Sequence, residues 1–282
     1  MMYTLIQTLT STAEVAGADY IQPTRNFSLA YVILDSIFVI AFMVLLFIQK
    51  KKMTFLFALA GGILYFLVDY LIFYVLTGSR EIFYLVSGAE EYQLCNSFQT
   101  ALVLFWMSMS YGIMDFAFIW LWLSKDKKAL EYTGLIVIWW ICCPLIADFF
   151  NNIFPSVMKL QTTRSTGKYH GVMGIIMAVG YIMILVMNII NKDKKEKQIP
   201  IVRLFIIGFM AQFLWELLLF VFGIRSQTYD NDVTRIITTI MVNSLVETNL
   251  GMPYLYFIHK GLMSKFNEEL SFERKETVLE NK

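Results

Sequence analysis

The sequence predicts an all-α protein that crosses a membrane with seven helices. Hydrophobic residues make up 57% of its 282 residues and charged residues only 16%, whereas charged residues are about a quarter of a typical soluble domain. The charges are confined to short segments between apolar stretches, and each stretch is long enough to cross a hydrocarbon core of roughly 30 Å. The predicted spans are about 28–49, 53–77, 98–123, 131–154, 170–191, 200–224 and 234–258.

Basic residues distinguish the two ends of the predicted bundle. One set of connections is rich in lysine, namely Lys50, Lys51, Lys52, Lys125, Lys127, Lys128, Lys192, Lys194, Lys195 and Lys197. The opposite connections carry fewer basic residues, mainly Arg80, Lys159, Arg164, Lys168, Arg225 and Arg235. By the positive-inside rule the lysine-rich end is cytoplasmic. We therefore expect a multi-pass protein of the cell membrane with an external segment 1–27, a membrane domain 28–258 and a cytoplasmic tail 259–282.

The second and sixth spans share a pattern of a polar residue, three apolar residues and an acid. It stands as Tyr65-Phe-Leu-Val-Asp69 in one span and as Gln212-Phe-Leu-Trp-Glu216 in the other. Continuing the alignment places the third span over the seventh, which indicates two parallel triplets joined by a linking span, a 3+1+3 repeat. Parallel repeats of this kind hold a binding site between their halves, near the midplane.

An acid lies within every predicted span except the fifth. These acids are Asp35, Asp69, Asp115, Asp148, Glu216 and Glu247. A charge at the centre of a span costs about 3 kcal/mol on insertion scales, so such residues usually face the bundle interior. Five of them follow a hydrogen-bonding side chain by four residues, on the same helix face: Tyr31, Tyr65, Tyr111, Gln212 and Asn243. Because the spans hold no basic residue placed to neutralise them, the sequence predicts that the acids are protonated or that an external cation completes the site.

The depth of the acids predicts an acidic vestibule. Asp35, Asp69, Asp148 and Glu216 fall in the outer third of their spans, whereas Asp115 lies in the inner third. The predicted ligand-binding residues are Asp69, Asp148, Gln212, Trp215, Glu216, Asn243 and Glu247, and the predicted proton path uses Tyr111 and Asp115. Trp215 is the candidate for a cation–π wall. The alternative is that these groups only join helices by hydrogen bonds of about 1 kcal/mol or less each.

Other kinds of site lack a signal in this sequence. Three cysteines and two histidines give neither a disulfide framework nor metal-ligand spacing. There is no glycine-rich phosphate loop and no Ser/His/Asp arrangement, and no basic patch interleaved with aromatics. We therefore expect no metal, no cofactor and no nucleic acid. The expected partners are the lipid bilayer and a small cationic or apolar ligand.

The stretches Phe66-Leu-Val-Asp69-Tyr-Leu-Ile-Phe-Tyr74 and Phe213-Leu-Trp-Glu216 resemble a helix of the membrane-bound terpene cyclases of fungal meroterpenoid and indole-diterpene pathways. The family's Asn-x-x-Trp-Glu pattern of the second span is not met at Asp69, and the Trp-Glu pair stands here in the sixth span. The resemblance implies a seven-span enzyme with Asp69 and Glu216 as protonated acids on an isoprenoid. The 3+1+3 plan is also similar to SWEET/PQ-loop carriers, whose Pro-Gln motif is absent.

Three functions follow from these patterns. The first is a transporter or ion pathway for a cation or amine, coupled or not to protons, with the outward acidic vestibule as its entrance. The second is a membrane-embedded acid/base enzyme acting on an isoprenoid or lipid, with Asp69, Glu216 and Glu247 as its catalytic candidates. The third is a seven-helix sensor or partner-binding protein.

Overall fold

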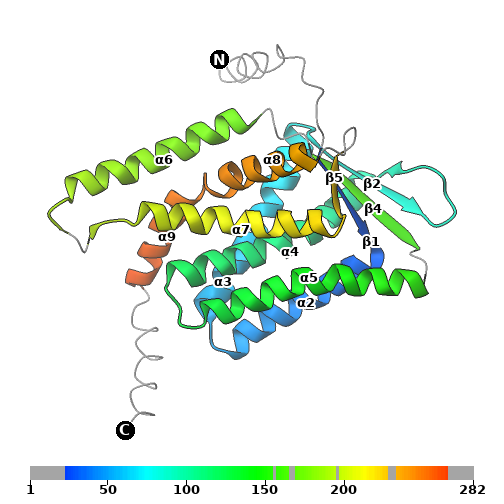
Figure 1. The fold of residues 1–282 in the computed structure, drawn as a ribbon, viewed down its shortest axis with the longest axis horizontal. Coiled ribbons are helices and arrows are strands. Elements are labelled where there is room, and N and C mark those ends of the chain that lie inside the picture. Colours follow the sequence, from blue (N-terminus) through cyan, green and yellow to red (C-terminus); the bar gives the residue numbers. More distant parts are fainter. Residues whose placement is uncertain (1–22, 155–156, 165–168, 195–196, 228–232, 266–282) are drawn as a thin grey trace, which may run out of the picture.

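The computed structural model describes residues 23–154, 157–164, 169–194, 197–227 and 233–265. The predicted external segment is therefore described only from Pro23, and the predicted tail only as far as Lys265. Helices make up most of the structure, and an antiparallel sheet lies across one end of them (Figure 1).

Six helical segments among the described residues are long and apolar enough to cross a membrane. They are α2 (Leu29–Ile48), α3 (Lys52–Leu67) with its π-helical continuation η1 (Val68–Leu76), α4 (Ser97–Leu123), α5 (Ala129–Ile153), α6 (His170–Ile190) and α7 (Ile201–Val221). They match the first six predicted spans to within a few residues. The protein is thus mostly helical and membrane-embedded.

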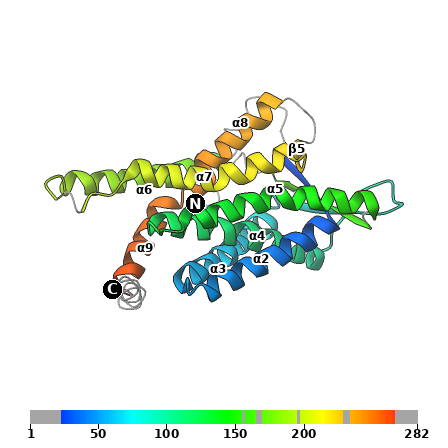
Figure 2. The ribbon, with the colours of Figure 1, turned by 60° about the horizontal axis from the view of Figure 1, so that its bottom comes forward.

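The seventh predicted span, 234–258, is interrupted in the structure. It consists of α8 (Val233–Asn243), the short π-helical η4 (Ser244–Thr248) and α9 (Met252–Lys265). The break falls just before Pro253, which cannot donate the backbone hydrogen bond that a continuous helix needs. Figure 2 shows α8 inclined steeply against α7. A seventh crossing and the 3+1+3 repeat stay predictions.

The sheet is the part of the fold that the sequence analysis did not predict. Its strands are β1 (Pro23–Ser28), β2 (Arg80–Val86), β3 (Gln93–Leu94), β4 (Met158–Arg164) and β5 (Arg225–Gln227), in the order β3-β2-β4-β1-β5. β1 lies in the predicted external segment 1–27 except for Ser28, and the other strands lie in segments that we expected to be external connections. β1 leads directly into α2. The strands β2, β4 and β5 each begin a few residues after a helical segment ends, namely η1, α5 and α7. These helical segments therefore meet the sheet at the same end.

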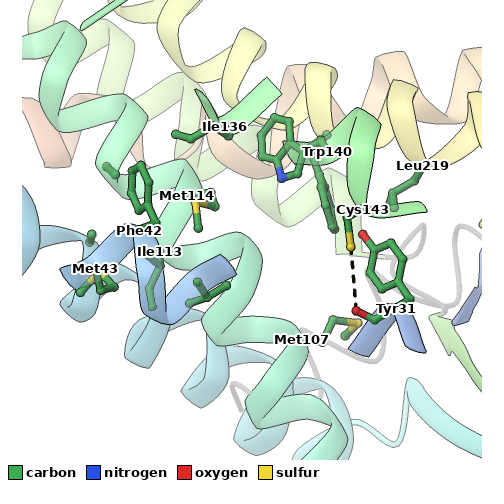
Figure 3. Packing of buried hydrophobic residues seen from close by; sticks show 14 of the residues in the cluster. Tyr31, Phe42, Met43, Met107, Ile113, Met114, Ile136, Trp140, Cys143 and Leu219 are labelled. Atoms are coloured by element: carbon green, nitrogen blue, oxygen red, sulfur yellow. Dashed lines mark hydrogen bonds between the residues drawn. The ribbon is translucent and has the colours of Figure 1, made fainter. Parts of the chain in front are cut away.

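Helix α4 is the central helix of the bundle. Within its most apolar stretch 72% of the residues are buried, against 22% for α2 and α5, whose other faces are open to lipid. Figure 3 shows the core beside α4, where Phe42, Met114 and Trp140 pack together. The Cys143 thiol on α5 contacts the carbonyl oxygen of Tyr31 on α2 at 3.9 Å.

Helices α3 and α4 approach most closely at glycines. A Cβ atom on Gly112 would lie 2.8 Å from the Cα of Gly62 and 3.0 Å from the carbonyl oxygen of Gly61. Since backbone atoms cannot move aside as a flexible side chain does, we expect Gly112→Ala to cost about 1–3 kcal/mol of stability by overpacking. Detergent-solubilised protein should show a lowered unfolding midpoint, whereas Gly134→Ala on α5, with nothing within 4 Å, should lose no stability.

Candidate functional site

Four of the five strands each supply one arginine at the boundary between the sheet and the helices. The Cα partners across the strand pairs are Arg80 with Arg164 and Arg25 with Arg225. Arg25, Arg80 and Arg225 are buried, with 6%, 2% and 2% of their surface exposed. Arginines are almost never buried without a partner, so we expect these arginines to pair with the acids on the helices.

Asp69 in η1 lies at the centre of the first ion pair. The Arg80 guanidinium donates to its Oδ1 at 2.5 Å. On the other side, Ser108 donates to Oδ2 at 2.9 Å and the Tyr111 hydroxyl donates to the same oxygen. Asp69 thus has charge-assisted hydrogen bonds from a strand and from the central helix α4 at once.

Glu216 on α7 is fully buried and pairs with two arginines. Arg25 donates to Oε1 at 2.5 Å, and Arg225 donates to Oε2. Gln212, one turn earlier, donates to Oε1 at 3.2 Å, so the predicted hydrogen bond between these two side chains is confirmed. Thr248 in η4 donates in turn to the Gln212 oxygen at 3.2 Å.

Arg164 on β4 joins the third acid to the others. It donates to Glu247 Oε1 in η4 at 2.5 Å, and the His170 ring lies 3.8 Å from the same oxygen. Burial lowers the pKa of Arg164, but the charges of Glu247 and Asp69 outweigh it and raise the pKa above its ordinary value. Arg164 therefore remains a cation shared among the carboxylates.

The surroundings of Arg225 shift its pKa in the opposite direction, below its ordinary value. Burial lowers the pKa of its guanidinium, and the positive charges of Arg25 and Arg164 lower it further, while Glu216 opposes them. Its Nε and Nη2 find no hydrogen-bond acceptor among the described residues, and neither does the Nε of Arg80. We call the four arginines with Asp69, Glu216 and Glu247 the arginine–carboxylate layer.

This layer corrects the expected charge state of the acids. The acids were expected either to be protonated or to be completed by an external cation, because no basic residue stood near them within the spans. For Asp69, Glu216 and Glu247 both expectations are wrong, since arginines from the sheet already neutralise the three carboxylates. Three of the basic residues that the orientation argument assigned to external connections, Arg80, Arg164 and Arg225, in fact point into the protein.

Two of the five predicted pairings within one helix are replaced by contacts between helices. Tyr111 donates to Asp69 rather than to Asp115, one turn away on its own helix. Tyr65 interacts with Asp115 instead of with Asp69, its expected partner. Neighbouring helices thus supply the nearer partner.

The remaining predicted site residues fall into three groups. Asp115 is fully buried near Glu216, one turn beyond Tyr111 on α4. Trp215 packs in the core, with its ring 5.4 Å from Trp140, so it forms no open wall. Asn243 is buried, and its side-chain amide has no hydrogen-bond partner among the described residues. Asp148 is exposed on α5 and does not join the layer.

Asp35 lies apart from the arginines. Trp106 donates to its Oδ2 at 3.1 Å, and Trp139 donates to its Oδ1 at 3.5 Å. Trp106 and Ser110 also line an apolar groove of about 690 Å³ between α2, α3 and α4. Two residues of the groove lining therefore contact a buried carboxyl.

Comparison with known proteins gives a short result. No protein family, no curated protein and no solved structure matches this chain. The sequence did carry one signal for the layer: the basic residues of the external connections are mostly arginine and those of the other end are mostly lysine. Arginine is the residue favoured for buried ion pairs, because its planar fork matches a carboxylate.

Proposed function

We propose that this protein is a membrane transporter whose outer end is closed by the arginine–carboxylate layer, and that its solute is a small anion. The observation that carries the proposal is the balance of charge: four arginines meet three carboxylates in direct ion pairs. An arginine fork binds carboxylate or phosphate groups well. An anion entering from outside would find donors on Arg225 and Arg80 that have no acceptor among the described residues.

The sequence predicted a transporter for a cation or amine, and we propose a transporter for an anion instead. A cation or amine would have to displace an arginine from Asp69, Glu216 or Glu247, leaving a buried guanidinium unpaired at a cost of several kcal/mol. An anion instead competes with these carboxylates for the arginines. Protonation of a released carboxylate would keep the charge balanced, so uptake coupled to protons fits the same layer, with Asp115 and Tyr111 next along the path.

Anion recognition is tested by ligand screening on the purified protein in neutral detergent. Small carboxylates and phosphate should raise the unfolding temperature, and amines of similar size should not. The effect should disappear in Arg225→Gln, which leaves Glu216 paired with Arg25, and persist in Lys159→Gln, an exposed site on the same sheet. Stabilisation by amines alone would contradict the anion proposal, and so would an anion response unchanged in Arg225→Gln.

The proposed orientation puts the sheet outside the cell membrane and the lysine-rich end inside, with the N-terminus external and the C-terminus cytoplasmic. It is tested in a cysteine-free background with single cysteines at Glu90 and Lys194, both exposed. A membrane-impermeant thiol reagent added to intact cells should modify the cysteine at position 90. The cysteine at position 194 should react only after permeabilisation, and the reverse pattern would invert the topology.

The apolar groove beside Asp35 favours a second candidate, an acid/base enzyme acting on an isoprenoid or lipid. The groove opens between helices whose outer residues face lipid, including Ile40 at 65% exposure. Its carboxyl would be Asp35, instead of the predicted Asp69, Glu216 and Glu247, which are held by arginines. Turnover of an isoprenoid that is abolished in Asp35→Asn and retained in Arg225→Gln would favour the enzyme over the transporter.

A further inference from the structure

A second groove, of about 600 Å³, opens at the lysine-rich end of the helices. Trp122 of α4, Asn188 of α6 and the first two turns of α7 form its walls. Volumes of this size are typical of small-molecule sites. The groove lies at the opposite end of the helices from the sheet, so it is separate from the arginine–carboxylate layer.

Hydrogen bonds hold this groove in shape. The Asn188 side chain donates to the Ile199 carbonyl oxygen and accepts from the Ile199 amide, both at 2.8 Å. Gln198 donates to the backbone oxygens of Asn188 and Asn191, at 3.0 and 2.7 Å. The connection between α6 and α7 is therefore anchored to the end of α6, and the groove does not have to form when a ligand binds.

The lining is apolar apart from Asn188 and one cation. Val202 and Ile206 line the groove and are 72% and 53% exposed, so the apolar side opens toward the hydrocarbon. Arg203 sits among them, and its Nη2 donates to the carbonyl oxygen of Trp122 at 2.5 Å. Among the ion pairs of the described residues none involves Arg203, which leaves most of its donors available.

The connection that precedes this arginine in the chain carries a net positive charge. The connection from 191 to 200 holds four lysines and two acids in the sequence. Lys192, Lys194 and Lys197 are exposed, as is Asp193. A basic connection that leads into an apolar groove at the lysine-rich end of the helices matches a molecule with an anionic head and a hydrocarbon chain, because polybasic segments gain about 1 kcal/mol per residue from anionic lipid.

We propose that this groove binds an anionic phospholipid of the leaflet at the lysine-rich end. The phosphate would lie on the Arg203 guanidinium, with the exposed lysines around it. One acyl chain would lie along Val202 and Ile206. Neither the arginine–carboxylate layer nor the identity of the transported solute enters this assignment, so it stands or falls separately from the proposed function.

The test uses the full chain in neutral detergent, with phosphatidylglycerol added and the bound lipid counted by native mass spectrometry. Phosphatidylglycerol should bind and raise the unfolding temperature, whereas phosphatidylcholine should do neither. Arg203→Gln should weaken phosphatidylglycerol binding by about tenfold or more, since hydrogen bonds to charged groups are the stronger kind. Ile206→Trp should weaken it too, by filling the slot while keeping every charge.

Lys260→Gln is the matched control, because this exposed lysine of α9 lies outside the groove lining and its loss removes the same charge. It should leave binding nearly unchanged. The lipid assignment is overturned if phosphatidylcholine binds equally well, or if inorganic phosphate alone protects as strongly as the lipid, which would mark a free-phosphate site. It is also overturned if Arg203→Gln and Lys260→Gln have equal effects.

Discussion

Replacing Glu216 with glutamine is expected to lower the free energy of unfolding by about 3–5 kcal/mol, because it leaves two buried arginines without their carboxylate. The sequence alone predicts that the same change abolishes function but largely preserves folding, since glutamine has nearly the shape of glutamate and carries no charge to desolvate. The structure reverses the expectation for folding, because Arg25 and Arg225 both pair with Glu216. The measurement is the unfolding midpoint in detergent.

A second substitution separates charge balance from loss of packing. In Glu216→Gln/Arg225→Gln one cation is removed together with the anion, so much of the lost stability should return. Glu81→Gln, an exposed change on β2, should shift the midpoint little, because single exposed charges contribute about 0–1 kcal/mol. If Glu216→Gln is as stable as the parent, the two arginines do not depend on this acid and the ion pairs are not formed.

The second large effect is expected at Arg80. Asp69 has one direct arginine partner, whereas Glu216 has two. Arg80→Gln should therefore cost about 3–5 kcal/mol, since it leaves Asp69 buried with only neutral donors in direct contact. Arg25→Gln should cost less than half as much, because Arg225 still neutralises Glu216. Unfolding midpoints of the two variants should differ in that order.

Tyr111→Phe provides a check on the same acid. It removes one hydrogen bond to Asp69 and leaves the ion pair intact, so its cost in unfolding free energy should stay near 1–3 kcal/mol.

A larger loss of stability in Arg25→Gln than in Arg80→Gln would contradict the pairing of Asp69 with one arginine and of Glu216 with two.

The helices were predictable from the sequence because each needs only a local run of apolar residues. The sheet was not, because its strands are as short as two residues and their partners stand far apart in the chain: β1 pairs with β4 over more than a hundred residues. In β4 the residues Thr162, Thr163 and Arg164 are polar, which is also the composition of an external loop. No apolar run marked β4 as a strand, whereas β2 does contain one, Ile82-Phe-Tyr-Leu-Val86, in a segment that we expected to be a connection.

The candidate site was half predictable for a related reason. The sequence located Asp69, Gln212, Glu216 and Glu247, because an acid in an apolar span is conspicuous. Their arginine partners stand outside the spans, where a basic residue is ordinarily a marker of orientation. Only the fold brings Arg25 from one end of the chain to Glu216, 191 residues later.

The most direct test of this account is a double-mutant cycle between Arg164 and Glu247, which lie on β4 and η4, 83 residues apart. Arg164→Gln, Glu247→Gln and the double variant would be compared by their free energies of unfolding in detergent. The ion pair between Arg164 and Glu247 predicts a coupling energy of about 1.5 kcal/mol or more, as for close charge pairs elsewhere. Additive effects, within about 0.5 kcal/mol, would mean that the strand arginine does not reach the helix carboxylate, and would contradict the layer.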